Sequence, residues 1–193
     1  RAFTINAVVE DGDKIIDLYG GQEDLKNKVL RHVSEHFVED PLRVIRGFRF
    51  ASCLNFSFAE ETKKLLTKMI SSGELETLSS ERVWGELKIV LEKGDPQIFF
   101  ELCESYHLTD FVFPALDVSQ IHWENLKGAN NENLFCLIFF HTKDRDKYFE
   151  KYTIPKNLKK MALLLKDTAS GLNCFFNKDP EHILDFYKRI RQD

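Results

Sequence analysis

The dipeptide Asp-Pro occurs three times in this chain, and each copy stands directly before a segment whose apolar residues have helical spacing. The copies are Asp40-Pro41, Asp95-Pro96 and Asp179-Pro180. Proline suits the first turn of an α-helix because no backbone N–H has to be satisfied there, and an aspartate before it can accept hydrogen bonds from free amides. Three such start signals indicate a chain built mainly from helices.

Everything after Gly21, apart from connecting loops, is predicted to be helical, because apolar side chains recur there every three or four positions. A polar, irregular stretch from Leu116 to Glu132 predicts a loop or a domain boundary. The expected helices are Leu25–Val33, Asp40 or Pro41 to about Ala51, Ala59–Ile70, one after Ser79, one after Asp95, and later ones near Asn133–Phe140, Lys156–Leu165 and Pro180–Arg191.

Residues 3 to 20 have a different pattern, which predicts a β-hairpin. An apolar, β-branched run ends at Val9, Asp11-Gly12-Asp13 supplies a turn, and Lys14–Leu18 returns. A two-stranded hairpin is marginally stable alone, so we expect it to complete a sheet whose other strands lie upstream of Arg1. The predicted fold class is therefore mainly α, with a short N-terminal β-hairpin.

Composition excludes several classes of function. A net charge of -4 argues against indiscriminate binding to nucleic acid, so any RNA contact must come from local basic clusters. The four cysteines are far apart in the sequence and show no zinc-binding spacing, which is typical of a reducing compartment. No signal peptide opens the chain, and no apolar run reaches the ~18 residues of a membrane span. We therefore expect a cytoplasmic protein without a membrane partner.

One expected helix carries an acidic residue and three arginines at three-residue steps: Asp40, Arg43, Arg46 and Arg49. Clustered arginines repel one another unless an anion binds, and phosphate matches their forked donors. The same residues allow a structural interpretation, in which Asp40 only caps the helix and the arginines face water. Spacing alone leaves both interpretations open.

Short motifs follow one another in a fixed order from Arg1 to Pro114. The chain opens with RAFTINA (Arg1–Ala7), and EDPLR (Glu39–Arg43) follows. Together they resemble the R-D-F-T-I-N-A and E-D-x-x-R motifs of class II tRNA nucleotidyltransferases, the family of bacterial CCA-adding enzymes and poly(A) polymerases. The resemblance is strong over residues 1 to 116 and weak beyond. Further landmarks of the family are Ile16-Asp17, Gly20-Gly21, Asp24-Leu25, Leu30-Arg31, Gly73–Glu76 and Glu81–Trp84.

The resemblance implies roles for individual residues. Asp40 and Arg43 match the pair that reads the base of the incoming nucleotide. Arg46 and Arg49 match positions that hold the nucleotide, most plausibly its phosphates, and Arg1 matches another. Asn6 is given a supporting contact. The implied substrates are CTP and ATP, and the implied partner is tRNA, whose 3′ end receives C and A.

The resemblance also implies a division of the chain. Residues 1–38 would be the end of a nucleotidyltransferase head, whose sheet the hairpin completes. Residues 39–94 would form a helical neck that selects the nucleotide, and residues 95–193 a helical body that contacts tRNA. Lys156, Lys159, Lys160, Lys166 and Lys178 could line the tRNA backbone path, although solvated helix faces explain them equally well.

Two departures from the family pattern limit what this chain can do. Ala2 stands where the family has aspartate, and the D-x-D carboxylates that hold two metal ions have no counterpart here. Mg²⁺ would therefore be held by residues of a missing N-terminal head segment, so we assign no catalytic residue and no metal ligand. His141 occupies a place similar to the histidine of an HD phosphohydrolase site, but Thr142 replaces its aspartate, and we expect no such site.

Two alternatives stay open. A bacterial poly(A) polymerase shares the E-D-x-x-R motif but adds only adenylate, whereas Gly73–Glu76 followed by Glu81–Trp84 favours CCA addition. A catalytically inactive RNA-binding module would explain Ala2 and the missing carboxylates.

Overall fold

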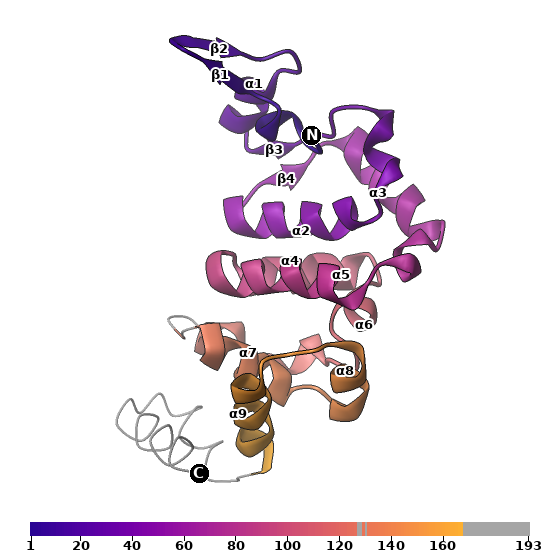
Figure 1. The fold of residues 1–193 in the computed structure, drawn as a ribbon, viewed down its shortest axis with the longest axis vertical. Helices are drawn as coiled ribbons and strands as arrows, with labels where there is room; N and C mark the ends of the chain where they lie inside the picture. The colour runs from indigo at the N-terminus through magenta and orange to yellow at the C-terminus, as the bar shows by residue number, and fades with distance from the viewer. Residues whose placement is uncertain (127–128, 130, 168–193) are drawn as a thin grey trace. The chain divides into compact units, whose positions relative to one another are not determined.

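The computed structural model describes residues 1–126, 129 and 131–167, and within them the fold is mainly α-helical, as predicted (Figure 1). The chain divides into two compact units, unit 1 (Arg1–Leu108) and unit 2 (Thr109–Asp193). The functional boundaries expected at 38/39 and 94/95 stay predictions. No helix among the described residues is both long and apolar enough to cross a bilayer.

The predicted hairpin is present but shorter than expected. Strand β1 (Val9–Asp11) pairs antiparallel with β2 (Lys14–Ile16), and Gly12 supplies the positive φ of the turn at 59°. All six strand residues are exposed. The expected strand before Val9 is wrong, because Thr4–Asn6 form a 3₁₀ helix in which the Asn6 side chain accepts a hydrogen bond from the Phe3 amide.

The expected helix over Leu25–Val33 is also wrong. Helix α1 (Gly21–Lys26) begins earlier, because the Asp17 carboxylate accepts hydrogen bonds from the backbone amides of Gly21 and Gln22. These amides lower the pKa of Asp17, with Gln22 contributing most. Gly21 has no substitute here, since a Cβ would lie 2.3 Å from the Thr4 carbonyl oxygen.

A small parallel sheet contradicts the expectation that everything after Gly21 is helical. Strand β3 (Val29–Leu30) pairs with β4 (Ser57–Phe58), which lies more than twenty residues away in the sequence. Local apolar spacing cannot reveal such a pairing, because the hydrogen bonds are made between distant segments.

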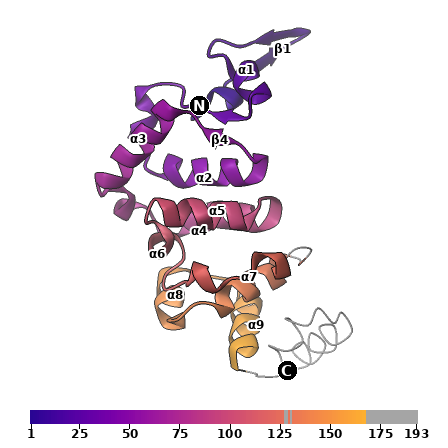
Figure 2. The ribbon, with the colours of Figure 1, turned by 180° about the vertical axis from the view of Figure 1, so that it is seen from behind.

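Helices α2 (Leu42–Leu54), α3 (Glu60–Ser71), α4 (Ser80–Lys93) and α5 (Pro96–Ser105) complete unit 1. Helix α2 packs against both α4 and α5, which lie together as the layer next to α2 in Figures 1 and 2. Asp95 caps α5 as predicted, with its side chain accepting from the Gln97 amide at 2.9 Å. The core between the layers contains Val44, Ile45, Phe48, Val83, Leu87, Val90 and Phe99.

Unit 2 is described as far as Asp167. Helices α7 (Asn131–Phe140) and α9 (Lys156–Asp167) were predicted, whereas α6 (Thr109–Val112) and α8 (Arg145–Lys151) were missed. The expected loop from Leu116 to Glu132 contains two short 3₁₀ helices, Val118–Gln120 and Trp123–Leu126. The helix expected over Pro180–Arg191 lies outside the described residues.

Candidate functional site

Helix α2 carries the predicted stripe, and Asp40 fixes its start. The Asp40 Oδ1 atom accepts a hydrogen bond from the Leu42 amide at 3.1 Å, and the Asp40 carbonyl accepts one from the Arg43 amide at 3.0 Å. Asp40 therefore caps the helix. The apolar face of α2 is buried, with Val44, Ile45 and Phe48 fully covered, so the charged side chains are confined to its rim.

The Asp40 carboxylate has a second partner that sequence reasoning did not assign. Arg82 of α4 places its Nη2 atom 2.9 Å from Asp40 Oδ1 and 3.1 Å from Oδ2. The Asp40 side chain is 35% exposed and that of Arg82 is 48% exposed. One nitrogen therefore bridges both carboxylate oxygens at a place that solvent still reaches.

Arg43 reaches back to the residues that precede α2. Its Nη1 atom donates to the His36 carbonyl oxygen at 2.5 Å, and its guanidinium lies 5.9 Å from the centre of the Phe37 ring. His36 in turn contacts Glu39, with 2.7 Å between its Nδ1 and the carboxylate Oε1. Arg43 and Asp40 thus stand together at the start of α2, each held by other groups.

The two later arginines of the stripe differ in their surroundings. Arg46 is exposed, and its guanidinium lies 6.0 Å from the centre of the Phe50 ring. Arg49 is only 12% exposed and donates from Nε to the equally covered Glu86 of α4. Cys53 also contacts Arg49, and burial raises the pKa of that thiol while Arg49 acts against the rise.

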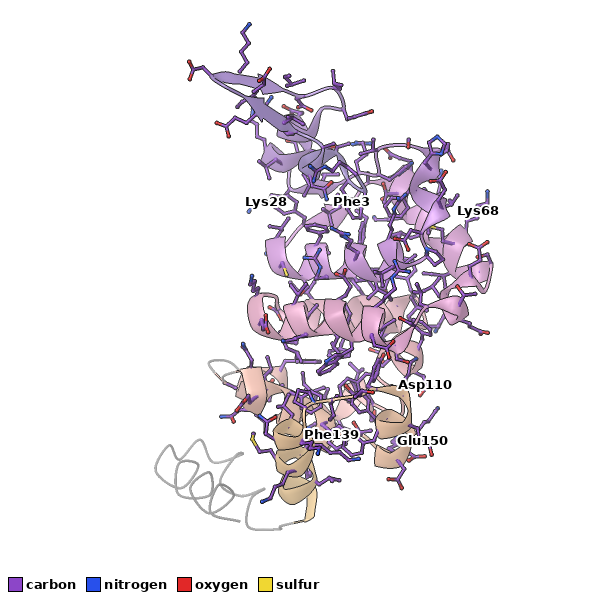
Figure 3. The ribbon with its side chains drawn as sticks, viewed as in Figure 1. Phe3, Lys28, Lys68, Asp110, Phe139 and Glu150 are labelled. Atoms are coloured by element: carbon purple, nitrogen blue, oxygen red, sulfur yellow. The ribbon has the colours of Figure 1, made fainter. Side chains whose placement is uncertain are left out.

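Phe3 joins the N-terminal segment to α2. Its buried ring meets Phe37 and Phe50 edge to face at centroid distances of 5.3 and 5.7 Å, and it is labelled in Figure 3. Gly47 of α2 provides the room, since a Cβ there would lie 3.1 Å from the Phe3 ring. Phe3 therefore holds the segment that contains exposed Arg1 and half-buried Asn6 beside Phe37, which Arg43 contacts, and Phe50, whose ring centre lies 4.1 Å from the Arg49 guanidinium.

A polar network, Thr4–Asp24–Arg31–Glu61, holds the same segment from its other side. The Thr4 hydroxyl donates to Asp24 Oδ2 at 2.6 Å, and Arg31 Nε lies 3.1 Å from the same oxygen. Arg31 also contacts Glu61 of α3 through Nη1. Thr4 and Asp24 are both buried, so this network fixes the Arg1–Asn6 segment relative to α1 and α3.

The structure thus gathers the predicted site residues around α2 and adds two that the sequence prediction missed. Arg82 and Glu86 both lie on α4, four residues apart, and each pairs with a residue of the stripe. A signal for Arg82 was present, because the motif Glu81–Trp84 contains it. Glu86 lies outside that motif and had no such signal.

The carboxylates of the described residues do not provide a metal site. No three of their His, Cys, Asp or Glu side chains come close enough to hold a metal ion together. This donor set does not fit Mg²⁺, and we derive no chemical step through it. In unit 2, His141 is half-buried and Thr142 is buried, while Lys156, Lys159 and Lys160 are exposed on α9; Lys178 lies outside the described residues.

Comparison with known proteins places this geometry in a family. Residues 55–119 match the family described as the probable RNA- and SrmB-binding site of polymerase A. A CCA-adding enzyme of Coxiella burnetii is 35% identical over 195 residues, which cover 96% of this chain and 52% of that protein. A multifunctional CCA protein of Vibrio cholerae is 47% identical over 121 residues, 61% of this chain and 30% of that protein. This chain therefore spans about half the length, or less, of these curated relatives.

Solved structures agree with these relatives. The Thermotoga maritima CCA-adding enzyme complexed with tRNA superposes with a TM-score of 0.65 at 25% identity, covering 89% of this chain and 48% of that one. A CCA-adding enzyme in complex with ATP gives a TM-score of 0.66 at 26% identity, covering 89% of this chain and 46% of that one. Motif order, sequence identity and fold agree, and the chain belongs to the class II tRNA nucleotidyltransferase family.

Proposed function

We propose that this chain is the nucleotide-selecting part of a CCA-adding enzyme, which adds C and A from CTP and ATP to the 3′ end of tRNA. The observation that carries the proposal is that Asp40 and Arg43 both lie at the start of α2, where the Arg43 amide donates to the Asp40 carbonyl and Arg82 holds the Asp40 carboxylate. The CCA-adding relatives, one of them solved with tRNA and one with ATP, support the choice of substrates.

Base choice follows from the hydrogen-bonding edges of the four nucleobases. Cytosine and adenine present an exocyclic amine beside an unprotonated ring nitrogen, whereas uracil and guanine present a carbonyl beside a ring N–H. An ionised carboxylate only accepts and a guanidinium only donates. The pair Asp40–Arg43 therefore fits C and A, and U or G would leave buried polar groups unpaired at about 1–3 kcal/mol each.

Both members of the pair keep the capacity that this role needs. A carboxylate offers about four lone-pair positions, and the Leu42 amide and Arg82 use three of them. One position on Oδ2 is therefore left for the amine of a base. Arg43 uses one of its five N–H donors on the His36 carbonyl, so several donors are left for a ring nitrogen.

The other predicted residues fit the remainder of a nucleotide. We assign phosphate contact first to Arg46 and Arg1, which are exposed. Arg49 follows, since its Nε is used on Glu86 and its terminal nitrogens can still meet an anion. Asn6 supports the segment by accepting from the Phe3 amide at 3.2 Å.

The proposal extends to the division of the chain and to its partners. Residues 1–38 complete the head, residues 39–94 form the neck, and residues 95–193 form the body that contacts tRNA. Lys156, Lys159 and Lys160 are available for the phosphate backbone of tRNA. Mg²⁺ enters only through residues outside this chain, and the protein acts in the cytoplasm.

Full-length enzyme and tRNA lacking its CCA end test the proposal. Incorporation of both C and A from labelled CTP and ATP is the expected result. Extension by A alone would indicate a poly(A) polymerase instead, and no incorporation at all would indicate an inactive RNA-binding module.

Replacing Arg43 by Ala tests the base-reading pair. The variant removes the donor to the ring nitrogen, so UTP and GTP incorporation relative to CTP should rise by about tenfold or more. Glu104→Ala, an exposed change on α5, serves as the matched control and should leave nucleotide choice unchanged. Full exclusion of UTP and GTP by the Arg43 variant would contradict the assignment.

A further inference from the structure

The contact between Arg82 and Asp40 determines which lone pairs of the carboxylate a base can reach. Oδ1 accepts from both the Leu42 amide at 3.1 Å and Arg82 Nη2 at 2.9 Å, which fills it. Oδ2 accepts from Arg82 at 3.1 Å and keeps one position. Asp40 therefore presents a single acceptor, in one orientation, to whatever binds beside it.

A carboxylate without this restraint would recognise the wrong base. The Watson–Crick edge of guanine carries a ring N–H beside an amine, and two free carboxylate oxygens can accept both at once. An aspartate that can rotate about its side-chain torsions would therefore admit guanine in a bidentate arrangement. Discrimination between guanine and the bases C and A therefore depends on how many carboxylate oxygens of Asp40 can still accept, and on the direction in which they face.

We infer that Arg82 is a positioning residue for base selection, which holds Asp40 so that its carboxylate accepts from an amine but cannot pair with guanine. This inference rests on the proposed function and deepens it. Arg82 contacts no part of the base in this role. It acts through Asp40 from the neighbouring helix α4.

The high exposed fraction of the Arg82 side chain argues that Arg82 does more than join helices α2 and α4. The second ion pair between these helices, Arg49–Glu86, has both side chains 12% exposed, whereas Arg82 is 48% exposed. Exposed ion pairs contribute little to folding stability. The more accessible pair is also the one that includes a base-reading residue, so its effect should appear in nucleotide choice more than in stability.

Full-length enzyme with Arg82→Ala tests the inference, with kcat and KM measured for CTP, ATP, GTP and UTP on tRNA lacking its end. GTP incorporation relative to CTP should rise by about tenfold, and by more than UTP incorporation, because only guanine offers two adjacent donors. The KM for CTP and ATP should rise more than kcat falls. Arg82→Lys should restore discrimination, since a single nitrogen makes the whole contact.

Glu86→Gln is the matched control, because it breaks the other ion pair between the same helices. It should lower the thermal midpoint without raising GTP incorporation. The inference is overturned if Arg82→Ala keeps the ratio of GTP to CTP incorporation within about twofold of wild type, or if Glu86→Gln raises that ratio equally. If Arg82→Ala does not fold, Arg82→Lys and Arg82→Gln test the inference instead. Arg82→Lys should retain discrimination against GTP, and Arg82→Gln should lose it. Wild-type enzyme that adds only A would refute CCA addition, and the ratio of GTP to ATP incorporation would still test Arg82.

Discussion

Unit 1 combines an apolar core with a charged and polar network anchored on buried Thr4 and Asp24, whereas the described interior of unit 2 consists largely of packed aromatic rings. In unit 1, Asp24 accepts from Thr4 and from Arg31 while almost fully buried. In unit 2, the rings of Phe113 and Tyr148 stack at 4.3 Å, and Phe139, labelled in Figure 3, closes over Tyr148 at 5.5 Å. Both units bury apolar side chains, and unit 1 adds directional polar contacts at the buried Asp24.

The difference bears on what each unit can hold in place. Hydrogen bonds and ion pairs are directional, so the network of unit 1 determines where Thr4 lies, and with it the neighbouring candidate site residues Arg1 and Asn6. Aromatic packing is strong but less directional, and it accommodates small shifts of a ring. Unit 1 therefore uses buried charge to orient a segment, while unit 2 uses burial mainly for stability.

The largest effect is expected from breaking the network of unit 1. Asp24→Ala removes the acceptor of the buried Thr4 hydroxyl and one partner of Arg31, which should lower the free energy of unfolding by about 2–3 kcal/mol. The proposed function adds that full-length enzyme should show a higher KM for nucleotide, because the Arg1–Asn6 segment loses its restraint. Urea denaturation and steady-state kinetics measure the two effects. Glu23→Ala is the control, since Glu23 is exposed and, within the described part of the chain, its side chain bonds to Asn27 of the same helical segment. A variant as stable as this control would show that the network does not restrain the segment.

Three of the four residues of this network, Thr4, Asp24 and Arg31, lie in motifs recognised from sequence, whereas Glu61 and all the contacts of the network were not predicted. Asp24 and Arg31 were recognised as landmarks of the motif order, as was Asp17, which caps α1. Their roles depend on which distant segment each side chain meets. Thr4 and Asp24 are twenty residues apart, and Arg31 and Glu61 are thirty apart. Apolar residues that recur every three or four positions indicate one face of a helix, and this spacing contains no information about contacts between distant residues.

The same limit separates the predicted half of the candidate site from the missed half. Asp40, Arg43, Arg46 and Arg49 belong to one helix and its cap, so local spacing in the sequence is enough to place them together. Arg82 and Glu86 reach that helix from α4, about forty residues later. Helix α8 and the pairing of β3 with β4 were missed for related reasons, because seven-residue helices and two-residue strands are too short to show a periodic pattern.

An effect of intermediate size is expected from two tyrosines of unit 2, which test whether hydrogen bonds stabilise that unit as well. Tyr152 donates from its hydroxyl to the Val112 carbonyl at 2.5 Å, whereas the buried Tyr148 hydroxyl has no hydrogen-bond partner within the described residues. Tyr152→Phe should therefore lower the free energy of unfolding by about 1–2 kcal/mol, and Tyr148→Phe should leave it unchanged or slightly raised. Urea denaturation of both variants checks this. Equal losses would mean that unit 2, like unit 1, depends on directional contacts from both hydroxyls.

The smallest effect concerns Asp110, an ion-paired carboxylate of unit 2. Its Oδ2 lies 2.8 Å from Lys147 Nζ and its Oδ1 accepts from the Ala115 amide at 2.7 Å, and these contacts, Lys147 first, lower the pKa of Asp110. A carboxyl whose pKa is lower in the folded state than in the unfolded state adds stability above the unfolded value. That stability is lost as pH falls through the lowered pKa.

Because the Asp110 side chain is 66% exposed, the contribution should be only a few tenths of a kcal/mol at neutral pH. Asp110→Asn keeps an acceptor for the Ala115 amide but removes the charge, so wild type should be slightly more stable at pH 6 and equal to the variant near pH 2 by thermal unfolding. A gap of constant size across this range would show that the contribution of Asp110 to stability does not depend on its charge.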